Sequence, residues 1–186
     1  MKMSKITGAG IGFALVFIIF KCIYFVSGLH YTNYNLVILT NIICVLLAVG
    51  LGMYMARDKN NKLLASGMER IKAGMRSGAV YAIVVSGFVY VYYNNIDKKF
   101  FKDKIQARVE LATKADFPTL QKNNPDKLAN QTHADFIDAE REQAELWFSP
   151  FMVSTLTLVA LMVCSMIYSV VMNVIFKNLF FKTGFK

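Results

Sequence analysis

The chain has 186 residues, 55% of them hydrophobic, and its formal net charge is +9 at pH 7. The apolar residues gather in long blocks, which excludes an ordinary soluble domain and predicts an integral membrane protein. The positive charge lies in short segments beside these blocks, so we interpret it as an orientation signal and expect no nucleic-acid partner.

Four apolar blocks are long enough to cross about 30 Å of hydrocarbon, which takes roughly 20 helical residues. We predict transmembrane helices at about residues 6–27, 36–56, 74–94 and 150–176, within a single membrane domain that covers residues 1–186. The first block is long and ends without a small-residue cleavage site, so we expect it to remain as a helix. The predicted fold is therefore an all-α integral membrane protein with four crossings.

The first predicted helix carries small residues at short intervals, among them Gly8 and Gly12. Such residues let helices approach closely, either within one bundle or between two copies of a chain. We expect packing within the bundle and keep homodimerisation as the alternative. Lys21 is an ionisable residue inside this block. We expect its ammonium to reach the headgroups as an interface anchor, and a functional buried cation is the alternative.

Lysine and arginine occur near the N-terminus, in residues 57–76 and in the C-terminal tail, whereas the link at residues 27–35 has neither. The long third link, residues 95–148, nearly balances basic and acidic side chains. The positive-inside rule then predicts an inner-membrane protein with a cytoplasmic N-terminus and a cytoplasmic C-terminus. Residues 95–148 are expected to form an extracytoplasmic helical segment.

The segment before the third crossing places charged and apolar side chains on different faces of a helix. This pattern predicts an amphipathic cytoplasmic helix that either bends near Gly74–Gly78 or projects from the membrane. Small residues at four-residue steps predict close helix packing: Gly74, Gly78, Ala82 and Ser86. Four cations are candidates for contact with lipid headgroups or with a partner: Lys62, Arg70, Lys72 and Arg76.

The third link is predicted to form a two-helix periplasmic cap, with helices at residues 97–113 and from Thr132 to Leu146. Phe117-Pro118 and a turn separate them, and Ser149-Pro150 has the pattern of a helix start for the fourth crossing. We expect the cap to be too small for a core of its own, so that it packs on the bundle, on lipid or on a partner. Aromatic rings at the outer interface are predicted anchors: Tyr90, Tyr92, Tyr93 and Trp147.

No sequence pattern indicates a catalytic centre, a metal site or a cofactor, and we predict that the protein is not an enzyme. Asn41 and Asn173 are amides inside apolar blocks. We expect them to form interhelical hydrogen bonds, with a polar substrate path as the alternative. His133 and Asp135 form a single His-x-Asp pattern, which is weak evidence for a metal site.

Three stretches occur in an order that resembles a known family: LLASGMERIKAGMRSGAVYAIVVSG, then FVYVYYNNI, then WFSP. The family consists of small Bacteroidota inner-membrane proteins and is catalogued as domain of unknown function 4199. The resemblance covers nearly the whole chain. It implies the cytoplasmic membrane of a Gram-negative cell, with the charged third link in the periplasm, and it supplies no functional residues.

These observations favour a non-catalytic accessory or scaffold subunit that packs against a larger inner-membrane complex. Its expected partners are membrane lipids and other membrane proteins, or a second copy of the chain. The alternative is a small carrier or flippase component for a lipid-linked substrate, in which the basic cytoplasmic helix holds phosphate groups.

Overall fold

A computed structural model describes residues 5–29, 34–56, 66–128 and 131–182 of the chain, and no strand occurs among them. The chain divides into two compact units. We call the first the bundle, which comprises Met1–Phe88 and Leu156–Lys186, and the second the charged unit, Val89–Thr155. Each unit has its own means of packing and is described separately.

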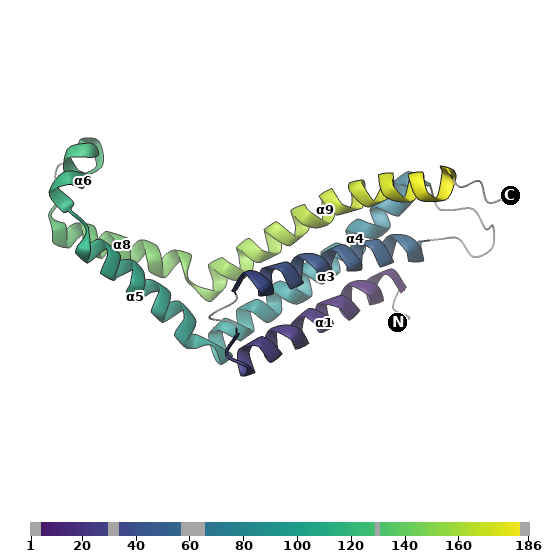
Figure 1. Cartoon of the computed structure of the whole chain (residues 1–186), viewed down its shortest axis with the longest axis horizontal. Coiled ribbons are helices and arrows are strands. Elements are labelled where there is room, and N and C mark those ends of the chain that lie inside the picture. Colours follow the sequence, from purple (N-terminus) through teal and green to yellow (C-terminus); the bar gives the residue numbers. More distant parts are fainter. Residues whose placement is uncertain (1–4, 30–33, 57–65, 129–130, 183–186) are drawn as a thin grey trace. The chain divides into compact units, whose positions relative to one another are not determined.

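Four described helices are long and apolar enough to cross a membrane, which confirms the predicted set of long apolar helices. They are α1 (Lys5–Val26), α3 (Tyr34–Met55), α4 (Gly67–Val91) and α9 (Pro150–Lys182). Figure 1 shows these helices lying lengthwise beside one another. Four such helices indicate a multi-pass membrane protein.

Helix α4 contacts the other three long helices and is the centre of the bundle. Its Ser77 hydroxyl donates a hydrogen bond of 2.8 Å to the carbonyl of Ala48 on α3. A side chain at Gly10 of α1 would collide with the Ser77 carbonyl, so these two backbones lie close together. On its remaining side α4 faces the serines of α9, described below.

Helix α4 begins with a capping box. The Ser66 backbone N–H donates to the Glu69 carboxylate at 2.9 Å, and the Glu69 N–H donates to the Ser66 hydroxyl at 3.3 Å. These two bonds satisfy donors that the first helical turn would otherwise leave unpaired. From Gly67 the helix is continuous to Val91, so no helix end separates its charged start from its apolar part. The predicted start near Lys62 lies outside the described residues.

The charged unit has more helices than the two predicted. It contains a π-helical turn η1 (Tyr92–Ile96) and the helices α5 (Lys98–Lys114), α6 (Phe117–Asn123), α7 (Pro125–Leu128) and α8 (His133–Trp147). Phe117-Pro118 was predicted only to end a helix, but it also begins one. The Asp116 carboxylate accepts a hydrogen bond from the Thr119 N–H, and Pro118 lies in the first turn, where no proline N–H is needed.

The predicted starts of α8 and α9 are confirmed. Thr132 and Asp135 form a reciprocal capping box at the start of α8. The Ser149 hydroxyl accepts a hydrogen bond of 3.2 Å from the Met152 N–H at the start of α9. Short polar side chains before an apolar run gave both signals in the sequence.

The charged unit has a small aromatic core, to which the predicted third crossing contributes Tyr92 and Tyr93 and the predicted cap contributes Phe101. The Tyr93 ring lies 4.4 Å from the Phe101 ring and 5.4 Å from the Phe100 ring, measured between centroids. Tyr92 packs edge-on against Tyr93 at 5.0 Å. Large rings bury much apolar area per residue, which is why a few of them suffice in a short, highly charged segment.

Candidate functional site

The sequence position of Arg70 suggested contact with lipid headgroups. In the structure its side chain is instead buried. Its side chain is only 6% exposed, and its Nε donates a hydrogen bond of 3.0 Å to the Asn173 Oδ1 on α9. Gly67 lies beside this pair, and a Cβ there would make only ordinary contacts, at 3.4 Å from the Asn173 Nδ2 and 3.9 Å from an Arg70 terminal nitrogen. The contact therefore joins α4 to α9.

The other predicted cations differ from Arg70 in exposure. Lys72 and Arg76 are exposed, and their four-residue spacing places them on one face of α4. Lys62 lies outside the described residues. Of the four candidates for headgroup or partner contact, the structure thus keeps Lys72 and Arg76 together at the surface and assigns Arg70 to helix packing.

The small residues predicted on α4 lie against its neighbours. A Cβ added at Gly74 would come within 2.7 Å of the Ser169 hydroxyl and 2.8 Å of the Met53 side chain. One added at Gly78 would come within 2.5 Å of the Ser165 Cβ and 3.0 Å of the Val49 side chain. These glycines therefore let α3 and α9 approach α4 from two sides.

Further along α4 the stripe of small residues is still covered by protein. Ala82 is fully buried, and Ser86 is buried with its hydroxyl donating to the Ile83 carbonyl of its own helix at 3.1 Å. Ser86 thus satisfies its hydroxyl locally and needs no polar partner on another helix.

On α1 the glycine at the closest helix contact is Gly10, and the two predicted glycines have other surroundings. A Cβ at Gly12 would meet no atom within 4 Å, so Gly12 does not provide the close approach that was predicted for it. Gly8 and Gly12 both line an open groove between α1 and α3. The alternating glycines of α1 therefore lie on two different faces of the helix. Their spacing in the sequence did not show which glycine lies on which face.

The amides inside the apolar blocks form hydrogen bonds between helices, as predicted. The Tyr81 hydroxyl on α4 donates to the Asn41 Oδ1 on α3 at 2.6 Å. Asn173 accepts from Arg70 across α4 and α9. A polar group inside hydrocarbon needs such a partner because no water is present to supply one.

Several predicted interface anchors are buried. Lys21 is only 7% exposed, so its side chain is covered by protein. Tyr92 and Tyr93 are buried in the aromatic core of the charged unit. Tyr90 and Trp147 are exposed, in keeping with an anchoring position. An aromatic cluster after an apolar helix has the same sequence pattern as an interfacial belt, so the sequence did not distinguish the two.

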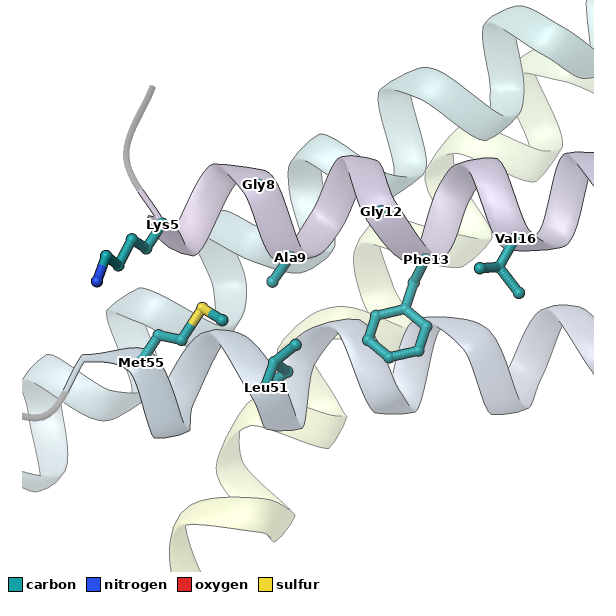
Figure 2. A pocket seen from close by; sticks show the side chains of 8 residues that line it. All are labelled: Lys5, Gly8, Ala9, Gly12, Phe13, Val16, Leu51 and Met55. Atoms are coloured by element: carbon teal, nitrogen blue, oxygen red, sulfur yellow. The ribbon is translucent and has the colours of Figure 1, made fainter. Parts of the chain in front are cut away.

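An open groove lies between α1 and α3. It has a volume of about 510 Å³ and extends from Lys5 past Gly8 and Gly12 to Val16 on α1. Figure 2 shows Phe13 pointing toward α3 and Leu51 of α3 pointing toward α1. Apart from Lys5, the lining is apolar or glycine.

A second hollow lies in the charged unit between α5 and α8, with a volume of about 210 Å³. The Arg108 Nε and the Glu140 carboxylate form an ion pair of 2.8 Å at its side. Trp147 and Phe148 also line it, and the Trp147 side chain is 48% exposed. The hollow thus combines an apolar ring with a charged pair at the surface.

Both residues of the His-x-Asp pattern at the start of α8 have structural roles. The His133 Nε2 lies 3.2 Å from the Ala112 carbonyl, and its ring stacks on Phe117 at 5.3 Å. Asp135 caps its helix, and the hydrogen bonds from Thr132 hold the pKa of its carboxyl below the usual 3.8. Within the described ranges, no three His, Cys, Asp or Glu side chains gather as metal ligands would.

A family model described as "Protein of unknown function (DUF4199)" matches residues 8–178. The chain belongs to the DUF4199 family. The match covers α3, α4, the charged unit and most of α1 and α9, which confirms the family suggested by the sequence stretches. No curated protein and no solved structure matches the chain. The family description supplies no activity, so the proposals below depend on the geometry of this chain.

Proposed function

We propose that this protein is a non-catalytic accessory subunit of a larger inner-membrane complex and that its charged unit docks onto a protein partner. The distribution of lysine and arginine supports an N-terminus and a C-terminus in the cytoplasm and a charged unit in the periplasm of a Gram-negative cell. In this proposal the bundle anchors the chain in lipid and the charged unit binds the partner.

The exposed Trp147 beside the Arg108–Glu140 pair carries this proposal. Tryptophan and arginine are enriched among the residues that dominate binding energy at protein interfaces. Leu111 and Leu146, each more than half exposed, add apolar area on the same two helices. A central aromatic anchor with charged groups beside it is the usual composition of a protein-binding surface.

The described surface of the bundle supports a division of labour between the units. In the bundle, contacts among α3, α4 and α9 occupy a set of small residues: Gly74, Gly78, Ser165 and Ser169. Its exposed side chains are largely apolar, for example Leu15 and Ile19 on α1 and Val159 on α9. Such a surface is suited to lipid, which needs no polar recognition.

The test is the size of the complex after mild detergent extraction from the native membrane, measured by native gel electrophoresis. We expect the wild-type chain to migrate in a species well above its own 21.0 kDa. Trp147→Ala combined with Arg108→Ala should release the chain from that species. Met68→Ala is the matched control, because Met68 is 62% exposed on α4 in the bundle. Release by Met68→Ala and not by the double variant would contradict docking through the charged unit.

A lipid-linked carrier function is the second candidate, favoured by the exposed cations Lys72 and Arg76 on one face of α4. These side chains could hold the phosphate of a lipid-linked substrate. Reconstituted vesicles assayed for lipid scrambling test this function. Lys72→Glu with Arg76→Glu should reduce any scrambling activity, whereas activity that is absent, or unchanged by the double variant, argues against the carrier.

A further inference from the structure

We propose that the groove between α1 and α3 binds one acyl chain of an anionic phospholipid, with the lipid phosphate at Lys5. The site is separate from the hollow in the charged unit, and it does not depend on the accessory function. Its eight lining residues come from the first two long helices alone.

The groove has the length of one lipid leaflet. On α1 it runs from Lys5 to Val16, which is about 16 Å at 1.5 Å per residue. The hydrocarbon core is about 30 Å thick, so one leaflet accounts for roughly 15 Å of it. Helix α1 begins at Lys5 and ends at Val26, so the groove extends from one end of the helix to its middle. An acyl chain anchored at that end fills this length.

The same length argues against a helix as the occupant. A transmembrane helix from a second copy would need a surface that continues across the whole hydrocarbon core. Among the described residues, the lining on α1 instead reaches as far as Val16, near the middle of the helix. An acyl chain needs only one leaflet, and it has the flexibility to follow an irregular apolar surface.

The space in the groove comes from residues without bulky side chains. Gly8, Ala9 and Gly12 lie on α1 opposite Leu51 and Met55 of α3. Figure 2 shows this separation, with only Phe13 extending far across it. The volume of about 510 Å³ falls in the range of small-molecule sites, which is roughly 300–1,000 Å³.

Charge selects the headgroup. Among the described residues, Lys5 is the one charged side chain in the lining, and it lies at the end of α1 where a lipid headgroup would be. An ammonium at the membrane surface attracts anionic lipids. The backbone N–H groups of the first helical turn add positive potential at the same end. A phosphatidylglycerol-type lipid therefore fits better than a zwitterionic one.

The test measures which lipids remain bound when the full chain is released from an equimolar mixture of phosphatidylglycerol and phosphatidylcholine and analysed by native mass spectrometry. We expect one retained phosphatidylglycerol per chain. Gly12→Leu should fill the groove and lower this retention at least about fivefold, which corresponds to roughly 1 kcal/mol. Lys5→Glu should remove the preference for phosphatidylglycerol.

Two matched controls separate the site from general membrane effects. Gly87→Leu makes the same change at another helical glycine where a Cβ meets no atom within 4 Å, but Gly87 does not line the groove. Lys177→Glu reverses an exposed charge on α9. Neither control should change retention. Equal retention of both lipids, unchanged by Gly12→Leu, would overturn the proposal.

Two further outcomes are decisive even if Gly12→Leu does not fold. Lys5 is exposed at the start of α1, so Lys5→Glu tests the headgroup without filling the groove. Loss of lipid selectivity in that variant alone supports the site. Full selectivity in Lys5→Glu contradicts it, as does a stable dimer that excludes lipid from the groove.

Discussion

The bundle and the charged unit achieve their packing in opposite ways. In the bundle, the closest contacts are made where side-chain volume is smallest, as at Gly78 against Ser165. In the charged unit, the core is made of large rings, with Tyr93, Phe100 and Phe101 in mutual contact. The difference is the one expected if lipid surrounds the bundle and water surrounds the charged unit, as we propose.

Lipid tails are as apolar as leucine, so large apolar side chains give little net association between membrane helices. Close backbone approach and interhelical hydrogen bonds provide it instead. A segment in water gains most from burying rings, since hydrophobic burial is the dominant favourable contribution there. The contrast predicts that bulky substitutions damage the bundle most and that truncations damage the charged unit most.

The largest effect is expected for Gly78→Leu. The added side chain would overlap Ser165 of α9 and Val49 of α3, so two helices must move away from α4. Overpacking usually costs about 1–3 kcal/mol and more where the surroundings cannot shift. We expect loss of the monodisperse species in size-exclusion chromatography in detergent. Gly87→Leu, with open space around it, should elute like wild type.

The reverse change, Phe101→Ala, tests the charged unit. Its ring packs on Tyr93 at 4.4 Å and is buried, so truncation should cost about 3 kcal/mol. Trp147, the single tryptophan of the chain, lies at the end of α8 and reports on unfolding of this unit by its fluorescence. The fluorescence midpoint should fall while the bundle stays folded. Leu111→Ala, at an exposed position on the same helix, should change the midpoint little.

These contrasts also explain what could be predicted from the sequence. The four long helices and the starts of α8 and α9 were predictable because apolar length and capping residues are local signals. The S-x-x-E pattern at Ser66–Glu69 is equally local and would have given the start of α4.

Contacts between distant segments could not be predicted. The burial of Arg70 depends on Asn173, which lies 103 residues further along the chain. The spacing Arg70, Gly74, Ser77 and Tyr81 could have indicated a buried face, but the positive charge favoured the surface. Likewise, the groove-lining residues could be told apart from the other residues of α1 only once the structure placed α1 beside α3.

A smaller effect is expected for Tyr81→Phe in the bundle. The change removes the hydrogen bond to the Asn41 Oδ1 and leaves the ring in place. Interhelical hydrogen bonds in membranes contribute about 0.6–2 kcal/mol. Unfolding in a denaturing detergent should report a loss of this size. A double-mutant cycle with Asn41→Leu checks the pairing, and additive effects of the two changes would show that the bond contributes nothing.

The smallest effect concerns the pH dependence of the charged unit. The pKa of Asp135 is lowered in the folded state by hydrogen bonds from Thr132. Its stabilising effect is therefore present above the usual value of 3.8 and is lost as pH falls through the lowered folded pKa. Trp147 fluorescence should show a lower unfolding midpoint in this acidic range. Asp135→Asn should reduce that dependence, and an identical pH profile in the variant would argue against the cap as its source.

The most direct test of the central claim uses a photo-reactive amino acid at position 147 or at position 68 in intact native membranes. Both residues are exposed, one on the charged unit and one on the bundle. We predict a discrete protein adduct from position 147, abolished by Arg108→Ala, and lipid adducts alone from position 68. A protein adduct from position 68 together with only lipid adducts from position 147 would contradict the assignment of partner binding to the charged unit.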